Sequence, residues 1–185
     1  LSADEKDVAF RCLTSMLNAG SLEASIHAVL RDIGIYYCAD RVYVLTLVEN
    51  RRALTMPYEW TNSGKRSIQQ SVSGLRLDRF PLLLRCLEER APVFLTRNTP
   101  FSATGESPDP GPWHFTTFPL IRNEQVEGFL CIENSREHPA DAALFSVLIP
   151  YLLRERERFG ASGQPGRPEA IDRLMELPNL RTYLE

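Results

Sequence analysis

The sequence has few of the residues that build metal or redox sites. Its 185 residues include four cysteines and three histidines. No Cys-x-x-Cys pair and no His-Glu-x-x-His frame occurs, so the spacing predicts no zinc site. Each cysteine lies in an apolar stretch, which favours reduced, buried thiols in a cytoplasmic protein. A redox pair and a covalent attachment site remain as alternatives.

The sequence also lacks a strong charge of one sign and a long apolar run. Its formal net charge is −3, so binding to nucleic acid or to an anionic membrane is not expected. No apolar run approaches the ~20 residues that span a bilayer. The first residues contain no signal core and no initiator Met, which indicates an internal piece of a longer protein.

Composition and length fit one globular domain with part of a second. Hydrophobic residues make up 43% and charged residues 24%, which excludes a disordered or fibrous protein. A chain of this length can bury a core without disulfide or metal support.

Two helices are expected first. Ser2 and Glu5 form a capping-box pattern, and apolar residues follow at helical spacing as far as Asn18. Ser21 can cap a second helix. Gly34 suits the left-handed position after the last turn of that helix.

A β-hairpin follows the helices. Arg41–Val48 is apolar on both faces, which is typical of a central strand. Ala53–Trp60 reads as its antiparallel partner, and Pro57 indicates a sheet edge because proline has no N–H. Four of its side chains are expected on one side of this strand: Leu54, Met56, Tyr58 and Trp60.

The middle of the chain is less regular. We expect a weak strand over Ser67–Val72, a helix over Arg79–Arg90 and a short strand over Pro92–Leu95. Thr96–Pro112 is rich in Pro, Gly, Ser and Thr and predicts a long surface loop.

A second hairpin and a long helix complete the pattern. Phe115–Ile121 and Val126–Glu133 predict two strands, with Gly128 marking a bulge or a close backbone approach. Pro139–Phe159 predicts a helix. Its apolar seam consists of Ala142, Phe145, Ile149 and Leu152.

The order of these elements predicts an α+β fold with a mostly antiparallel sheet. The N- and C-terminal helices would pack on one face, and residues 61–112 would cover the other. A concave site between this cover and the sheet is the natural place for a small ligand.

The chain resembles a GAF domain over about residues 21–158. Phe118–Ile121, a polar turn and Val126–Asn134, followed by a long helix, are similar to the C-terminal half of that family. The N-terminal half fits through the helix from Ser21, the strand from Arg41 and the run Tyr58-Glu59-Trp60. The resemblance implies a GAF-like regulatory domain over residues 1–159.

The last residues resemble the opening of a GGDEF, or diguanylate cyclase, domain. Asp172–Arg181 is similar to Asp-x-Leu-Thr-Gly-Leu-Pro-Asn-Arg-Arg, although Met175 and Glu176 replace Thr-Gly and Leu180 replaces Arg. The Gly-Gly-Asp/Glu-Glu-Phe loop is absent, so this chain is not expected to be an enzyme. The resemblance implies a flexible linker at 160–168, a cyclase-like domain opening at 169–185, and GTP and Mg²⁺ bound only in the rest of that domain.

Known GAF ligands restrict the choice of effector. The chain has no Asn-Lys-x-Phe-Asp-Glu motif for cyclic nucleotides and no Cys-His pair for a bilin, and only His114 is available for haem. No cofactor is therefore expected, and the effector is an unidentified small polar or aromatic molecule. The candidate lining is Tyr58, Trp60, Arg76, Phe80, Trp113, Phe115 and Glu133. Tyr58, Trp60 and Phe115 also fit an ordinary core, with Arg76 solvated.

The helix seam indicates a homodimer, although the same residues could simply pack on the sheet. Two cyclase halves must meet to join two GTP molecules, so a ligand that favours one pairing geometry would control synthesis. The Gly/Pro-rich linker favours control by tethering over a rigid lever. Two alternatives remain: a GAF-like methionine sulfoxide reductase using Cys86 or Cys131, and a ligand-free structural dimerisation module.

Overall fold

The computed structural model describes residues 1–96, 114–138 and 142–161. The helices are α1 (Ala3–Asn18), α2 (Leu22–Tyr36), α3 (Gln69–Val72), the short 3-10 helix η1 (Leu77–Arg79), α4 (Pro81–Glu89) and α5 (Ala143–Ala161). The strands are β1 (Arg41–Val48), β2 (Ala53–Thr61), β3 (Leu75–Arg76), β4 (Val93–Thr96), β5 (His114–Arg122) and β6 (Gln125–Glu133).

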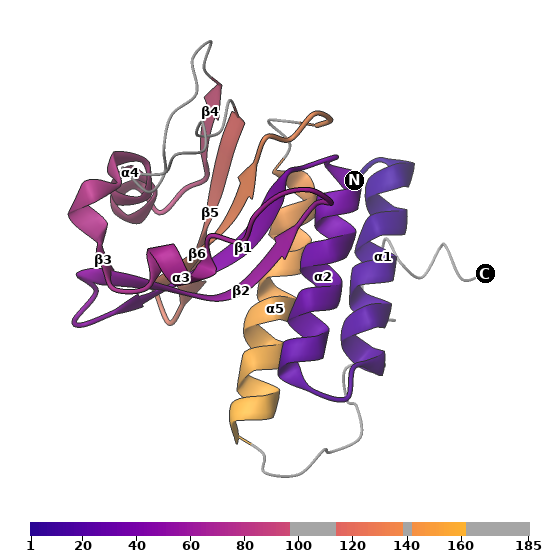
Figure 1. Ribbon diagram of the computed structural model, residues 1–185. Helices are drawn as coiled ribbons and strands as arrows, with labels where there is room; N and C mark the ends of the chain where they lie inside the picture. Colours follow the sequence, from indigo (N-terminus) through magenta and orange to yellow (C-terminus); the bar gives the residue numbers. More distant parts are fainter. Residues whose placement is uncertain (97–113, 139–141, 162–185) are drawn as a thin grey trace.

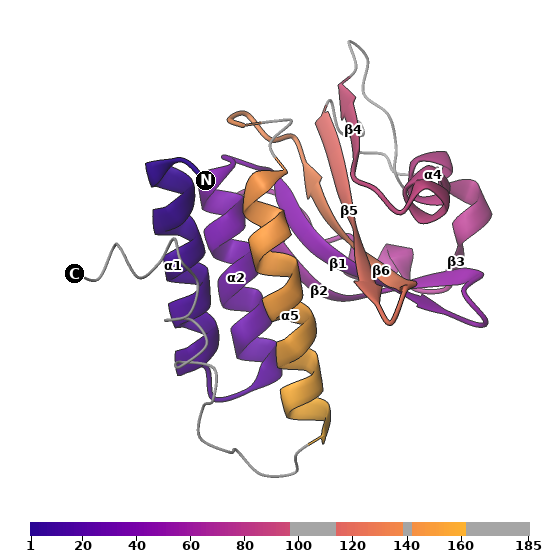
Figure 2. The same cartoon turned by 180° about the vertical axis from the view of Figure 1, so that it is seen from behind.

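The strands form one six-stranded sheet in the order β3-β2-β1-β6-β5-β4. Every neighbouring pair is antiparallel. On one face α2 and α5 lie against the sheet and α1 packs against these two helices, and the other face carries α3 and α4 (Figure 1). Figure 2 shows the three long helices side by side from behind. The predicted α+β class and the two-sided covering of the sheet are confirmed.

Side-chain caps begin the first two helices, as predicted. The Ser2 hydroxyl accepts the Glu5 N–H at 3.2 Å, and the Glu5 carboxylate accepts the Ser2 N–H in return. The Ser21 hydroxyl accepts the Ala24 N–H at 3.1 Å. These bonds satisfy N–H groups that have no partner inside the helix.

Gly34 does not end α2, so that prediction is wrong. The helix continues to Tyr36, and the residue with positive φ beyond it is Cys38, at 46°. Gly34 is required by packing instead, because the ring of Trp60 on β2 lies directly against its Cα.

A β-bulge divides β2 into two parts that face opposite sides of the sheet. Between Val44 and Thr46, β1 has one residue where β2 has two, Met56 and Pro57. An extra residue reverses the alternation of all side chains beyond it. Leu54 and Met56 therefore pack on the face covered by α3 and α4. Tyr58 and Trp60 pack on the opposite face, against the layer of α1, α2 and α5. The prediction that all four share one side is wrong.

Gly128 shows both features expected of it. The β5–β6 register shifts beside it, between Leu120 and Ile121. A Cβ on Gly128 would also lie 2.1 Å from the carbonyl oxygen of Leu45 on β1. Only glycine lets the two backbones approach this closely.

The cover of the second face begins with a helix where a weak strand was predicted. Residues 69–72 form α3, and the Gln69 side-chain amide donates to the Pro57 carbonyl at 3.0 Å. Beyond β1, the described strands pair with β2 only at Ala53 and Leu54. Pro57 therefore lies on a free edge, as expected. The predicted loop at 96–112 lies outside the described residues, apart from Thr96.

The predicted seam of α5 is mostly used inside the chain. Phe145 and Leu152 are buried in the apolar core that the sheet forms with α1, α2 and α5. The Phe145 ring stacks on Phe118 with centroids 4.0 Å apart. Ala142, just before the helix, and Ile149 are partly buried. All four seam residues thus pack against the core of this chain, two of them with part of their surface left exposed.

Candidate functional site: a buried ionic cluster on the covered face of the sheet

A buried ion pair lies where β1 begins and β6 ends. Arg41 and Glu133 stand directly opposite each other on these two central strands. The Arg41 Nη1 lies 2.9 Å from Glu133 Oε2, and the side chains are only 10% and 3% exposed. Tyr43, two residues along β1, donates its hydroxyl to Glu133 Oε1 at 2.9 Å. Both oxygens of this carboxylate are therefore occupied by donors.

A second carboxylate and a loop close over this pair. Glu59 Oε1 on β2 lies 4.0 Å from Arg41 Nε, and it accepts the Ile68 N–H at 3.0 Å. The Ser67 hydroxyl bonds the other oxygen of Glu59. Arg41 donates to the Arg66 carbonyl through Nε at 3.2 Å and Nη2 at 3.1 Å. Polar groups of the sheet therefore hold the segment before α3 in place.

Burial determines the protonation of this cluster. Loss of water raises the pKa of Glu133, although Arg41 and the Tyr43 hydroxyl oppose the shift. Burial, and then the charge of Glu133, raise the pKa of Tyr43 well above its usual value, so Tyr43 remains a neutral donor. One guanidinium beside the carboxylates of Glu59 and Glu133 gives the cluster a formal charge of −1 when both are ionised.

A neighbouring polar cluster joins the ends of three segments. Asp40 accepts from Asn134 Nδ2 at 2.8 Å and Arg136 Nη2 at 2.7 Å, and Lys65 Nζ lies 3.0 Å away. Burial alone would raise the pKa of Asp40, but these partners outweigh it and hold the pKa below its usual value. The Asp40 N–H donates to the Glu133 carbonyl at 2.9 Å, which connects the two clusters.

Three of the predicted lining residues lie on this face. Phe80, at the start of α4, and Phe115, on β5, belong to the apolar cluster between the sheet and its cover. Phe115 is directly opposite Glu133 on the neighbouring strand. The structure thus brings Phe115 and Glu133 together, with Phe80 in the same layer.

The other predicted lining residues are elsewhere. Tyr58 and Trp60 pack against the helices on the opposite face, because of the bulge in β2, so they cannot share a wall with Glu133. Arg76 is solvent-exposed and bonds Asp78, with Nε 3.0 Å from Oδ2. Trp113 lies outside the described residues.

Sequence reasoning missed Arg41, Tyr43 and Glu59. Arg41 and Tyr43 share one face of β1, because side chains alternate along a strand. Arg41 is a charged residue at the start of an otherwise largely apolar strand, and this could have marked it as a candidate site residue. Glu59 faces Tyr43 across β1 and β2. Recognising the cluster requires the register of three strands, which no single segment contains.

The cysteines near this face are buried and protonated. Cys86 Sγ lies 3.9 Å from the Thr117 carbonyl, and Cys131 Sγ lies 3.5 Å from the Thr117 hydroxyl. Burial raises the pKa of Cys86 to about 12 and that of Cys131 well above its usual value. Neither thiol is activated as a nucleophile in this arrangement.

Other site types find little support in the described parts of the chain. Residues 1–96, 114–138 and 142–161 contain no group of three or more His, Cys, Asp or Glu side chains that could hold a metal ion. His114, the haem candidate, lies at the start of β5 with its Nδ1 3.2 Å from the Thr96 hydroxyl. Among the described helices, none is both long and apolar enough to cross a membrane.

Comparison with known proteins relates the chain to others by fold alone. No protein-family model and no curated protein matches its sequence. Among solved structures, the GAF domain of a phosphoenolpyruvate-protein phosphotransferase from Coxiella burnetii matches with a TM-score of 0.64 and 16% identity, covering 86% of this chain and 96% of that one. The phycocyanobilin-bound GAF domain of a cyanobacterial phytochrome matches with a TM-score of 0.64 and 13% identity, covering 89% and 100%.

An enzyme is also similar in fold. The free methionine-R-sulfoxide reductase of Neisseria meningitidis, in complex with its substrate, matches with a TM-score of 0.61 and 11% identity, covering 85% of this chain and 90% of that one. The curled antiparallel sheet, the terminal helices on one face and the cover on the other are thus those of the GAF fold.

Proposed function

We propose that this chain is the sensory part of a signalling protein and binds a small polar effector on the covered face of its sheet. The observation that carries this proposal is the buried cluster of Arg41, Tyr43, Glu59 and Glu133 beneath the segment before α3. Buried charges are expensive, and a buried group with a shifted pKa beside a specific charge partner, such as Glu133 beside Arg41, is a candidate functional site.

The cluster favours a ligand that carries hydrogen-bond donors. Its two carboxylates outnumber its one guanidinium, so an ammonium, amidine or amide group on the ligand would compensate the excess negative charge. Phe115, which is buried beside Glu133, would pack against the rest of the molecule. Amino acids and nucleobases combine these features.

A thermal-unfolding screen of amino acids, nucleobases, nucleotides and aromatic acids tests this proposal. A ligand at 100 times its dissociation constant should stabilise the protein by about 2.7 kcal/mol. Tyr43→Phe should weaken binding of any hit, and Tyr151→Phe on α5 is the matched control. A hit that binds Tyr43→Phe as tightly as the unmodified chain would place the effector elsewhere.

We further propose that the effector controls a diguanylate cyclase domain that begins near residue 169. The similarity of Asp172–Arg181 to the opening of that domain supports this assignment. Cyclic di-GMP production from GTP by the longer protein, measured with and without a hit from the screen, is the direct test. A longer protein without a Gly-Gly-Asp/Glu-Glu-Phe motif would contradict it.

Control by dimerisation is part of the same proposal. Ala142 and Ile149 remain partly exposed on the seam, beside Pro150 and Leu153, along an open groove of about 700 Å³. Light scattering should show a dimer that Ile149→Gln weakens. A strict monomer at high concentration would contradict dimer-based control.

The fold of the methionine sulfoxide reductase gives a second candidate function. It requires Cys86 or Cys131 to act as a thiolate, which their raised pKa values oppose. NADPH-coupled reduction of free methionine sulfoxide would demonstrate this activity. If no compound in the ligand screen raises the unfolding temperature and the protein is a stable dimer, the purely structural dimerisation module is favoured instead.

A further inference from the structure

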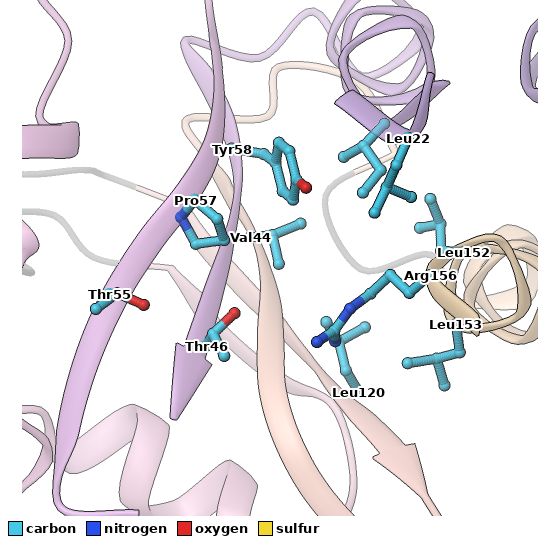
Figure 3. A pocket seen from close by; sticks show the side chains of 11 residues that line it. Leu22, Val44, Thr46, Thr55, Pro57, Tyr58, Leu120, Leu152, Leu153 and Arg156 are labelled. Atoms are coloured by element: carbon cyan, nitrogen blue, oxygen red, sulfur yellow. The ribbon is translucent and has the colours of Figure 1, made fainter. Parts of the chain in front are cut away.

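A cavity lies on the face of the sheet opposite the ionic cluster. It has a volume of about 330 Å³ and is bounded by the start of α2, the second half of α5 and the strands β1, β2 and β5. This volume is near the lower end of the ~300–1,000 Å³ range of small-molecule sites. The lining is Leu22, Ile26, Val44, Thr46, Thr55, Pro57, Tyr58, Leu120, Leu152, Leu153 and Arg156 (Figure 3).

The cavity results from divergence of the sheet and the helix layer. Figure 1 shows the β1–β2 hairpin turning away from α5 toward its tip while the helices continue downward. Short side chains, Val44, Thr46 and Thr55, line the strands at this point. The bulge at Pro57 then turns Tyr58 toward the helices. Side chains of this size do not fill the widening space.

The wall of the cavity is apolar, with polar groups concentrated at a few points. Leucine, isoleucine, valine and proline supply most of it. Figure 3 shows Arg156 reaching from α5 across the cavity toward the strands, and Tyr58 turned from β2 toward α2 and α5. Thr46 and Thr55 add two hydroxyl groups. An apolar pocket with one cation suits a molecule with an apolar body and one anionic end.

The cation is well placed to exchange its present partner for a ligand. Arg156 Nη1 lies 3.7 Å from Glu127 Oε2, which is an ion-pair distance but too long for a hydrogen bond. Glu127 has a closer partner in Arg122, whose Nε lies 2.6 Å from Glu127 Oε1. A guanidinium has five N–H donors arranged to bind a carboxylate through two of them.

We propose that this cavity binds an amphipathic carboxylate, with its aliphatic or aromatic body among Leu22, Ile26, Leu120 and Leu152 and its carboxylate on Arg156. The site is independent of the ionic cluster, because the sheet separates the two. Its ligand would contact α2, α5 and the strands together. Occupancy would therefore favour one position of α5, the helix that continues to Ala161 and so includes the first two residues of the proposed linker at 160–168.

Binding of octanoate and of 3-phenylpropionate to the full chain, measured by calorimetry, tests the proposal. At least one should bind with a Kd below about 1 mM. Preference for octanoate would identify a fatty acid as the ligand class, and preference for 3-phenylpropionate an aromatic acid. 1-Octanol, which has the apolar body without the charge, should bind more weakly than octanoate. Equal affinity of octanol and octanoate, or no binding of either acid, would overturn the proposal that this cavity binds a carboxylate.

Substitutions locate the site. Arg156→Gln should weaken binding of the carboxylate about tenfold or more and leave octanol unaffected, since charge-assisted bonds are lost. Arg154→Gln, an exposed arginine on the same helix, is the matched control and should change nothing. An equal effect of the two variants would indicate general charge attraction and contradict the site.

Filling the cavity gives a second, independent readout. Leu22→Trp, at the partly buried rim, should abolish binding of both octanoate and octanol. Thr55→Phe, on a strand that tolerates aromatic residues, should do the same if Leu22→Trp proves unstable. Unchanged binding in a folded filling variant would show that the ligand sits elsewhere.

Discussion

The indole ring of Trp60 occupies the place where any other residue at position 34 would put its side chain. A Cβ built on Gly34 would lie 2.1 Å from Trp60 Cζ3. This contact is far inside van der Waals distance, so a glycine in the last turn of α2 is what allows the helix to lie flat on β2. The contact joins the helix layer to the part of β2 beyond its bulge.

Gly34→Ala should therefore lower the free energy of unfolding by about 1–3 kcal/mol, although alanine is the better helix former. Urea unfolding measures the change. Gly20→Ala, where nothing lies within 4 Å of a new Cβ, is the control. Adding Trp60→Leu should recover part of the loss, because the smaller side chain leaves room for the methyl group. Additive effects of the two substitutions would contradict a direct clash.

Gly128→Ala should be more destabilising than Gly34→Ala. Its new Cβ would meet the backbone oxygen of Leu45 at 2.1 Å, and a backbone carbonyl cannot rotate away as a side chain can. We expect a loss of about 3 kcal/mol or more, since the central β1–β6 pairing would have to open. Hydrogen exchange of the β1 amides should rise in parallel. Protected β1 amides in the variant would contradict this account.

Local signals in the sequence were sufficient for most elements. The Ser2–Glu5 capping box, the Ser21 cap and the second hairpin each depend on residues close in the chain, and each was predicted correctly. The GAF-like fold followed from their order. These features need no knowledge of distant contacts.

Features set by distant contacts were not predictable in the same way. Gly34 near the end of a helix reads as a cap until Trp60 is known to lie against it. The bulge at Met56 and Pro57 exists only relative to β1, so alternation along β2 alone put Tyr58 on the wrong face. The ionic cluster likewise needs the register of three strands.

Asp40 gives a prediction for acid stability. Its partners hold its pKa below the usual value, so the stability it contributes is present above about pH 3.8 and is lost as pH falls through the folded-state pKa. Asp40→Asn should cost about 2 kcal/mol at pH 7, because hydrogen bonds to charged groups are lost. The difference from the unmodified protein should shrink below about pH 3.8.

Urea unfolding at several pH values measures this dependence. Glu88→Gln, at an exposed acid on α4, should change stability by no more than about 0.5 kcal/mol. A cost of Asp40→Asn that stays the same down to the lowest pH would show that packing, and not the charge of Asp40, is responsible.

The cysteines should differ sharply in reactivity. Cys38 is exposed, whereas the other three are buried. Burial raises the pKa of Cys12 and of Cys86 to about 12, so only about one thiol in 10,000 is ionised at pH 8. Iodoacetamide should label Cys38 alone in the folded protein and all four in urea, as read by mass spectrometry. Rapid labelling of Cys86 or Cys131 would contradict the inert assignment and favour the reductase alternative.

Glu133 should show a pH dependence opposite to that of Asp40. Burial raises its pKa, so the folded state binds this proton more tightly than the unfolded state does. Its contribution is therefore most favourable below the unfolded value of about 4.5 and declines as pH rises through the folded-state pKa. Glu133→Gln cannot titrate and should remove this decline. Between pH 4.5 and 8, the stability of the variant should rise relative to the unmodified protein. A gap that moves the other way would mean that Arg41 and Tyr43 outweigh the desolvation of Glu133 and hold its carboxylate ionised, so that the ion pair stabilises the folded state more as pH rises.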